Sequence, residues 1–172
     1  MDGSIQVYYG NGRGKTTAAL GLGIRAAGVG KQVIMVQFLK KKHSDTLDFL
    51  KKLEPELQIF RFEKAACGYS DLSPKEKQEQ MLNIKNALGY SRKVLDTGQC
   101  DLLILDEIFG LVDYNIITIE ELMDLIAVKK DSMDLILTGR NLPDEVREIA
   151  DCVYSIQREK EKTPEILAQG IF

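Results

Sequence analysis

The first twenty-seven residues carry the pattern that most restricts the fold. A short apolar stretch at 4–9 leads into Gly10-Asn11-Gly12-Arg13-Gly14-Lys15-Thr16-Thr17, and a helical pattern follows over 15–27. A strand, a glycine-rich loop, Gly-Lys-Thr and a helix in this order are typical of a phosphate-binding P-loop. The glycines let successive backbone N–H groups face one point, and the helix N-terminus adds free N–H groups and a positive dipole end. We therefore expect an anionic ligand to bind here.

The side chains of this loop predict separate roles. Lys15 is expected to neutralise phosphate charge, and the Thr16 hydroxyl to ligate Mg²⁺. The general pattern has glycine six residues before the lysine, where this chain has Tyr9. A glycine-rich turn that binds nothing is the alternative interpretation. The residues expected to bind the nucleotide are Gly10, Asn11, Gly12, Arg13, Gly14, Lys15, Thr16 and Thr17.

A second stretch predicts the rest of a metal site. Residues 102–105 are an apolar run that ends in Asp106 and Glu107. Such a run indicates a buried strand that delivers two carboxylates to the edge of the sheet where the P-loop lies, and Mg²⁺ prefers oxygen ligands. A core strand that continues into an ordinary polar loop is the alternative. The predicted metal ligands are Thr16, Asp106 and Glu107.

Apolar stretches alternate with helical patterns along the whole chain. The expected strands cover about 4–9, 32–38, 57–62, 102–105, 133–138 and 152–156, and the expected helices 15–27, 44–53, 74–97, 143–149 and a segment from 119 onward. Ser73 and Thr118 begin capping boxes, and Pro74 and Pro143 are placed to start helices. The pattern predicts one α/β domain over 1–172, a P-loop fold of about six mostly parallel strands with helices on both faces.

Ligands of such sheets bind beyond the carboxyl ends of the strands. The segments expected to meet at that edge are the P-loop, Lys40–His43, 63–71, Asp106-Glu107 and Thr138–Arg140. Thr138 and Arg140 can approach bound phosphates only if the fifth strand lies beside the first. The cationic run Lys40–His43 has two interpretations, a nucleic-acid patch or a solvated loop, and its position also allows a role near the phosphates.

Composition excludes several classes of function. The net charge of −3 gives no reason to expect a nucleic-acid partner, and no apolar run is long enough to span a membrane. Cys67, Cys100 and Cys152 lack paired spacing, which argues against disulfides and a zinc site and favours the cytoplasm. His43 is the single histidine, so a histidine-dependent nucleophile is not expected.

The same motifs, in this order, resemble the corrinoid adenosyltransferases of the P-loop type, which move an adenosyl group from ATP to cobalt. The matching segments are 10–19, 25–26, 36–38, 105–107, 137–140, 150–151 and 168–171. These short segments are distributed along nearly the whole chain. The combination of Gly-Asn-Gly-x-Gly-Lys-Thr-Thr with Thr-Gly-Arg is the most specific part of the match.

The resemblance implies a particular reaction. The Co(I) centre of a corrinoid attacks the 5′ carbon of ATP and triphosphate leaves, so no general base is required. ATP with Mg²⁺ and a corrinoid are the implied ligands, with a flavoprotein as electron donor and a homodimer as the assembly. Lys15, Arg140 and Tyr69 are the implied catalytic residues, and Arg25 matches a nucleotide contact. The protein's task is then to align the reactants and to neutralise the departing triphosphate.

The chain departs from the family in three places. The family's glycine, phenylalanine, threonine, tryptophan loop is Gly68-Tyr69-Ser70-Asp71 here, so one ring is kept and one is replaced by a carboxylate. In the family these rings help to remove the lower axial ligand of cobalt. Residues 108–110 lack the usual polar residue, and 158–165 is shorter and lacks a Lys-His pair. A regulatory ATP-binding relative and an ordinary P-loop ATPase or phosphotransferase are the alternative functions.

Overall fold

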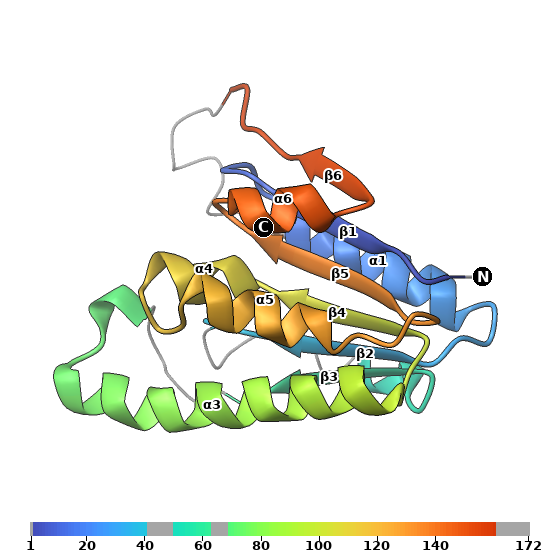
Figure 1. Cartoon of the computed structure of the whole chain (residues 1–172), viewed down its shortest axis with the longest axis horizontal. Helices are drawn as coiled ribbons and strands as arrows, with labels where there is room; N and C mark the ends of the chain where they lie inside the picture. The colour runs from blue at the N-terminus through green and yellow to red at the C-terminus, as the bar shows by residue number, and fades with distance from the viewer. Residues whose placement is uncertain (1, 41–49, 63–68, 161–172) are drawn as a thin grey trace.

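The computed structural model describes residues 2–40, 50–62 and 69–160. Figure 1 shows one twisted sheet with helices packed against it. The strands are β1 (Ile5–Tyr9), β2 (Val33–Gln37), β3 (Leu57–Arg61), β4 (Leu102–Asp106), β5 (Asp134–Gly139) and β6 (Cys152–Ser155). The α-helices are α1 (Lys15–Ala27), α3 (Pro74–Thr97), α4 (Ile108–Asp113), α5 (Ile119–Ala127) and α6 (Asp144–Ile149), with short 3₁₀ turns η1 (Lys51–Leu53) and η2 (Tyr69–Asp71).

The six strands of the described residues form one sheet in the order β3-β2-β4-β5-β1-β6, and every pairing is parallel. The predicted α/β class is confirmed. β5 lies beside β1, with Tyr8 opposite Thr138 and Tyr9 opposite Gly139, as the proposed positions of Thr138 and Arg140 require. All carboxyl ends of the strands therefore face one edge, which carries the P-loop.

Two hydrophobic clusters, one on each face of the sheet, hold the helices. Ala19 on α1 packs with Met35, Ile104 and Ile136 of the central strands. The other face is covered by α3, α4, α5 and α6, whose buried side chains join the strands in the larger cluster. Of the four inner strands, β2 and β4 are buried at all five positions, because helices cover both of their faces. Helices on both faces were predicted, and this is confirmed.

The helix starts follow the capping signals. Ser73 and Thr118 each accept a hydrogen bond from the backbone N–H three residues on, and Glu76 and Glu121 return the contact. Two details differ from expectation. Pro143 is the residue before α6 rather than its first residue. The helix α4 was not predicted at all, because it is six residues long and has no side-chain cap at Glu107. Most of the predicted helix over 44–53 lies outside the described residues.

Candidate functional site

The P-loop lies between β1 and α1, and other strands hold it from behind. The N–H of Gly10 donates to the carbonyl of Arg140 at 3.0 Å, and the N–H of Gly12 donates to the carbonyl of Ile156 at 2.9 Å. A Cβ on Gly12 would lie 2.8 Å from the Ile156 oxygen, and one on Gly10 would also collide with it. These two glycines therefore allow close backbone packing. Gly14, with φ of 110°, begins α1, whose first-turn N–H groups are available to an anion.

Lys15 lies folded over this loop. Its Nζ donates to the carbonyl oxygens of Gly10 at 2.7 Å and Gly12 at 2.9 Å. Burial lowers the pKa of the Lys15 ammonium, the nearby Glu107 carboxylate works in the opposite direction, and Lys40 and Arg140 lower it further. The lysine is thus placed among cations that favour an incoming anion.

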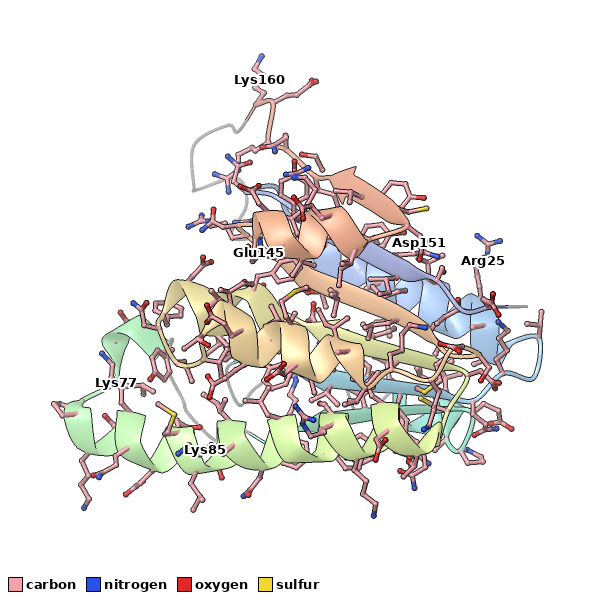
Figure 2. All side chains as sticks on the ribbon, viewed as in Figure 1. Arg25, Lys77, Lys85, Glu145, Asp151 and Lys160 are labelled. Atoms are coloured by element: carbon pink, nitrogen blue, oxygen red, sulfur yellow. The ribbon has the colours of Figure 1, made fainter. Side chains whose placement is uncertain are left out.

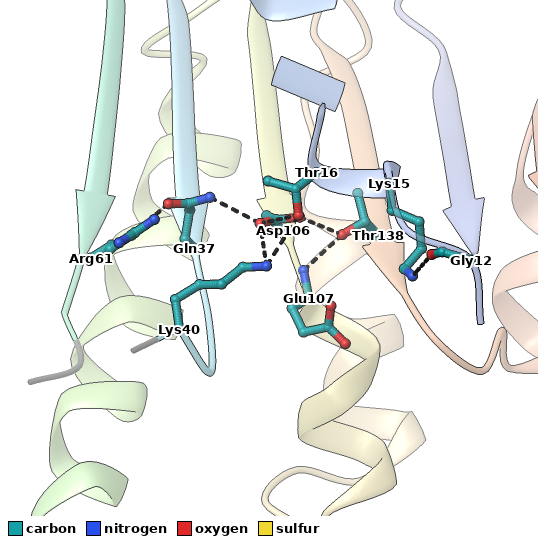
Figure 3. A network of polar contacts seen from close by, with 9 residues as sticks. All are labelled: Gly12, Lys15, Thr16, Gln37, Lys40, Arg61, Asp106, Glu107 and Thr138. Carbon is teal, nitrogen blue, oxygen red and sulfur yellow. Dashed lines mark hydrogen bonds and ion pairs between the residues drawn. The ribbon is translucent and has the colours of Figure 1, made fainter. Parts of the chain in front are cut away.

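A fully buried carboxylate, Asp106, lies at the centre of the site (Figure 3). It accepts hydrogen bonds from the Thr16 hydroxyl at 2.9 and 3.1 Å, from the Thr138 hydroxyl at 2.7 Å and from Gln37 Nε2 at 3.0 Å. The Lys40 ammonium lies 3.4 Å away. A buried carboxylate is stable only with such partners, so Asp106 ties β4 to β2, β5 and the P-loop helix.

The contacts of Asp106 continue to the edge of the sheet. Arg61, at the end of β3, donates from Nε to Gln37 Oε1 at 2.6 Å. This contact fixes the Gln37 amide so that its NH₂ group faces Asp106 (Figure 3). Burial lowers the pKa of the Arg61 guanidinium, while the charge of Asp106 acts to raise it. Four adjacent strand ends and the P-loop therefore share one polar network.

Thr138 also sets the position of Glu107. The backbone N–H of Glu107 donates to the Thr138 hydroxyl at 2.8 Å. Glu107 has a left-handed backbone, with φ of 63°, and α4 begins directly after it. This turn sends the Glu107 carboxylate away from Asp106, as Figure 3 shows. The two predicted carboxylate ligands, Asp106 and Glu107, are therefore adjacent in sequence but point in different directions.

A cavity of about 540 Å³ opens beside these groups. Its lining comes from the P-loop and from the residues that follow β2, β4 and β5. The lining residues are Asn11, Gly12, Arg13, Gly14, Lys15, Thr16, Lys40, Glu107, Gly110, Asp113, Tyr114, Arg140 and Asn141. Four of these are cations and two are carboxylates, a formal excess of two positive charges in a chain of net charge −3. The cavity is thus suited to a polyanion.

The predicted residues are only partly brought together. Asn11 to Thr16, Glu107 and Arg140 line the cavity, and Asp106 lies behind it; Gly10 is buried beneath the loop and Thr17 is exposed. Arg25 is not at the cavity. It lies in the last turn of α1, about 15 Å along the helix from Lys15 at about 1.5 Å per residue. Figure 2 shows Arg25 at the far end of that helix. Arg25 is thus distant from the lining of this cavity, and its contact with a nucleotide stays a prediction.

Tyr69 contacts a second aromatic residue, Tyr114, which lines the cavity. Its ring centroid is 5.3 Å from that of Tyr114, which lines the cavity at the end of α4, and Lys77 lies 5.7 Å from the Tyr69 centroid. Tyr114 was missed in the sequence because its helix was missed. Asp113, next to it, accepts a hydrogen bond from Asn141 Nδ2 at 3.0 Å. The rest of the predicted corrinoid loop, 63–68, lies outside the described residues, as does His43.

Further observations bear on the predicted absences. In the described part of the chain, no helix has the length and apolar character needed to cross a membrane. The same residues contain no group of three or more His, Cys, Asp or Glu side chains that could hold a metal ion. Cys100 is a buried free thiol, and burial raises its pKa to about 12.

Comparisons with known proteins identify the family of the chain. The model of the family described as ATP:corrinoid adenosyltransferase BtuR/CobO/CobP matches residues 1–171. Corrinoid adenosyltransferases from Escherichia coli K12 and Salmonella typhimurium are each 30% identical to this chain over 155 residues, covering 90% of it and 76% of each relative. The Pseudomonas aeruginosa corrinoid adenosyltransferase is 24% identical over 88% of this chain and 73% of its own length.

A solved structure supports the fold independently. The KaiC-like protein of Pyrococcus horikoshii superimposes with a TM-score of 0.61 at 19% identity, over 94% of this chain and 75% of that chain. At this identity the likeness concerns the fold alone. The family match over nearly the whole chain and the identity with the enterobacterial enzymes establish more. The chain belongs to the ATP:corrinoid adenosyltransferase family and is a transferase.

Proposed function

We propose that the cavity binds Mg·ATP with its triphosphate over the P-loop and presents the ribose 5′ carbon to cobalt near Tyr114. The observation that carries this proposal is the charge of the lining, where Lys15, Lys40 and Arg140 gather around one opening. A departing triphosphate is the most highly charged group in the reaction. Preorganised cations at the place where charge develops lower the barrier of such a reaction more than other groups do.

The bonds change in a single displacement. The electron pair of Co(I) forms the bond to the 5′ carbon, and the bond from that carbon to the triphosphate oxygen breaks. Triphosphate leaves with the bonding electrons, and cobalt becomes alkylated. No proton moves in this step, so the reaction has no need of a general base. Lys15 and Arg140 hold the leaving group, and the walls of the cavity keep the two reacting atoms aligned.

The donor set fits a magnesium ion. The Thr16 hydroxyl and the Asp106 carboxylate are hard oxygen ligands, they lie 2.9 Å apart, and a cationic ammonium already contacts both. Thr16 and Asp106 would hold the ion, and Glu107 is a further candidate ligand on the cavity side. When bound, Mg²⁺ supplies positive charge that offsets the charge of triphosphate.

In this proposal the corrinoid contacts the aromatic side of the cavity. Tyr114 offers a ring that is 48% exposed, and Tyr69 packs behind it. A corrin ring has broad, largely apolar faces, which such aromatic surfaces can contact. A flavoprotein electron donor, a homodimer and a cytoplasmic location belong to the same proposal and rest on the family resemblance and the cysteine spacing.

Product analysis tests the proposal. The protein is mixed with Mg·ATP and a corrinoid that has been chemically reduced to Co(I), and the phosphate products are separated. Triphosphate in equal amount to the alkylated corrinoid is expected. ADP with phosphate would instead assign the site to phosphoryl transfer, and binding without turnover would assign it to an ATP-binding regulator.

A further inference from the structure

The Lys40 side chain does not extend into solvent as in a solvated loop, but contacts Thr16 and Asp106. Lys40 follows β2 by three residues, and Leu39 before it has a left-handed backbone with φ of 55°. This turn carries the lysine back over the strand end. The Lys40 Nζ donates to Thr16 Oγ1 at 3.1 Å and lies 3.4 Å from Asp106 Oδ2, as Figure 3 shows.

These two oxygens are the same atoms that fit a magnesium ion. The Thr16 hydroxyl and the Asp106 carboxylate contact one another, and the Lys40 ammonium contacts both. If the Lys40 ammonium and Mg²⁺ contacted the same two oxygens, these two cations would lie only a few ångströms apart, roughly 4 Å or less, and would repel each other strongly. Mg²⁺ also requires close approach, at about 2.1 Å from each ligand. The ammonium and the metal ion therefore exclude each other.

The ammonium is needed when no metal is bound. Asp106 is fully buried, and a buried carboxylate without a counter-charge is costly. The Lys40 side chain is 29% exposed and lines the cavity, so it can move into the cavity without crossing the core. Lysine has a flexible stem and a compact charge, which suits a group that changes partners.

We infer that the Lys40 ammonium occupies the magnesium position in the nucleotide-free enzyme, is displaced when Mg·ATP binds, and then contacts the triphosphate. The inference rests on the proposed function, because it takes Thr16 and Asp106 as the metal ligands. Its consequence is that the empty enzyme holds divalent ions poorly. The metal enters with the nucleotide, whose negative charge attracts the displaced ammonium.

The first experiment measures Mn²⁺, a paramagnetic substitute for Mg²⁺, bound to the nucleotide-free protein by the loss of the free-ion resonance. Lys40→Met is expected to bind Mn²⁺ at least about tenfold more tightly than the wild type, because one competing unit charge is removed. Lys31→Met is the matched control. Lys31 precedes β2, at the opposite end of that strand, and also pairs with an aspartate, Asp134 at 3.2 Å. Its Mn²⁺ affinity should equal that of the wild type.

The second experiment measures the binding of inorganic triphosphate by calorimetry, with Mg²⁺ or with a chelator. Lys40→Met should lose more affinity in Mg²⁺ than in chelator, because only the metal frees Lys40 to contact the ligand. If Lys40→Met does not fold, Lys40→Gln replaces it, and the rise of the unfolding temperature with added Mn²⁺ is compared with that of the wild type. A larger rise in the variant supports the inference.

Two results would overturn the inference. Equal Mn²⁺ affinity in the wild type and Lys40→Met would show that the ammonium does not compete for the site. An equal loss of triphosphate affinity with and without Mg²⁺ would show that Lys40 does not change partners. A separate result would contradict the proposed magnesium site itself. In that case the wild-type protein would bind triphosphate no more tightly with Mg²⁺ than without it.

Discussion

The Thr138 hydroxyl offers the sharpest test of the polar network. It donates to Asp106 Oδ1 at 2.7 Å and accepts from the Glu107 N–H at 2.8 Å, and its side chain is fully buried. Thr138→Val keeps the shape and removes both contacts. The lost hydrogen bond to a carboxylate and the unpaired N–H each cost about 1–3 kcal/mol. We expect a loss of about 2–4 kcal/mol in the free energy of unfolding, since neighbouring effects are not fully additive.

Thr138→Ser is the matched control. Serine keeps the hydroxyl and loses one buried methyl group, at a cost of about 1 kcal/mol. Both free energies are measured by urea unfolding at pH 7, followed by circular dichroism. The expected changes are large enough to measure, because the total stability of a domain of this size is about 5–15 kcal/mol. The serine variant should also keep most of the adenosyl transfer activity, and the valine variant should lose much more of it.

A free energy of unfolding for Thr138→Val within about 0.5 kcal/mol of the wild-type value, the usual range of neutral substitutions, would refute this role of the hydroxyl. An equal loss of unfolding free energy in Thr138→Ser and Thr138→Val would refute it as well. Either result would mean that packing at this position, rather than the two hydrogen bonds, fixes the turn at Glu107.

Three further predictions concern other parts of the chain. Lys15→Ala should lower turnover by at least about 100-fold, measured as triphosphate release, because it removes a cation from the leaving group. Tyr69→Ala should lower the rate with Co(II) and a reductant at least about tenfold more than the rate with supplied Co(I); equal losses would indicate that the ring only packs against Tyr114. Asp134→Asn should destabilise by about 1 kcal/mol at pH 7. Partial burial acts to raise the pKa of Asp134, but contacts from Ser4 and Lys31 bring it below the ordinary 3.8. The folded state thus favours the ionised form, so the difference from wild type should shrink in unfolding curves below pH 4.

The strands were predictable because burial leaves a direct trace in the sequence. β2 and β4 are covered on both faces, so all five residues of each are buried and the apolar runs are nearly continuous. The capping boxes at Ser73 and Thr118 are local signals and gave the correct helix starts. Only the pairing of β5 with β1 was predicted, from the requirement that Thr138 and Arg140 reach the phosphates.

The missed features depend on contacts far apart in the chain. The packing role of Gly10 and Gly12 was not foreseen, because their N–H groups bond to residues after β5 and β6. Their contact with a nucleotide stays a prediction. The separation of Arg25 from the cavity was also not foreseen, because Arg25 lies in the last turn of α1 and Lys15 in the first. Lys40 stood in a charged run typical of solvated loops. Its ion pair with Asp106 depends on a left-handed turn at Leu39, which no propensity of leucine would indicate.

The two halves of the cavity are built in different ways. The phosphate side is carried by strand ends and the P-loop, which Asp106 joins through hydrogen bonds. The aromatic side depends on α4, whose Phe109 is fully buried and packs directly against Gly139, where a Cβ would collide with it. Tyr114 is thereby fixed relative to β5, the strand that also carries Thr138. In the proposed arrangement, the packing of α4 on β5 would set the distance between the triphosphate and the corrinoid. This packing places the aromatic ring of Tyr114 beside the cavity, although Asp71 stands where the family has a tryptophan.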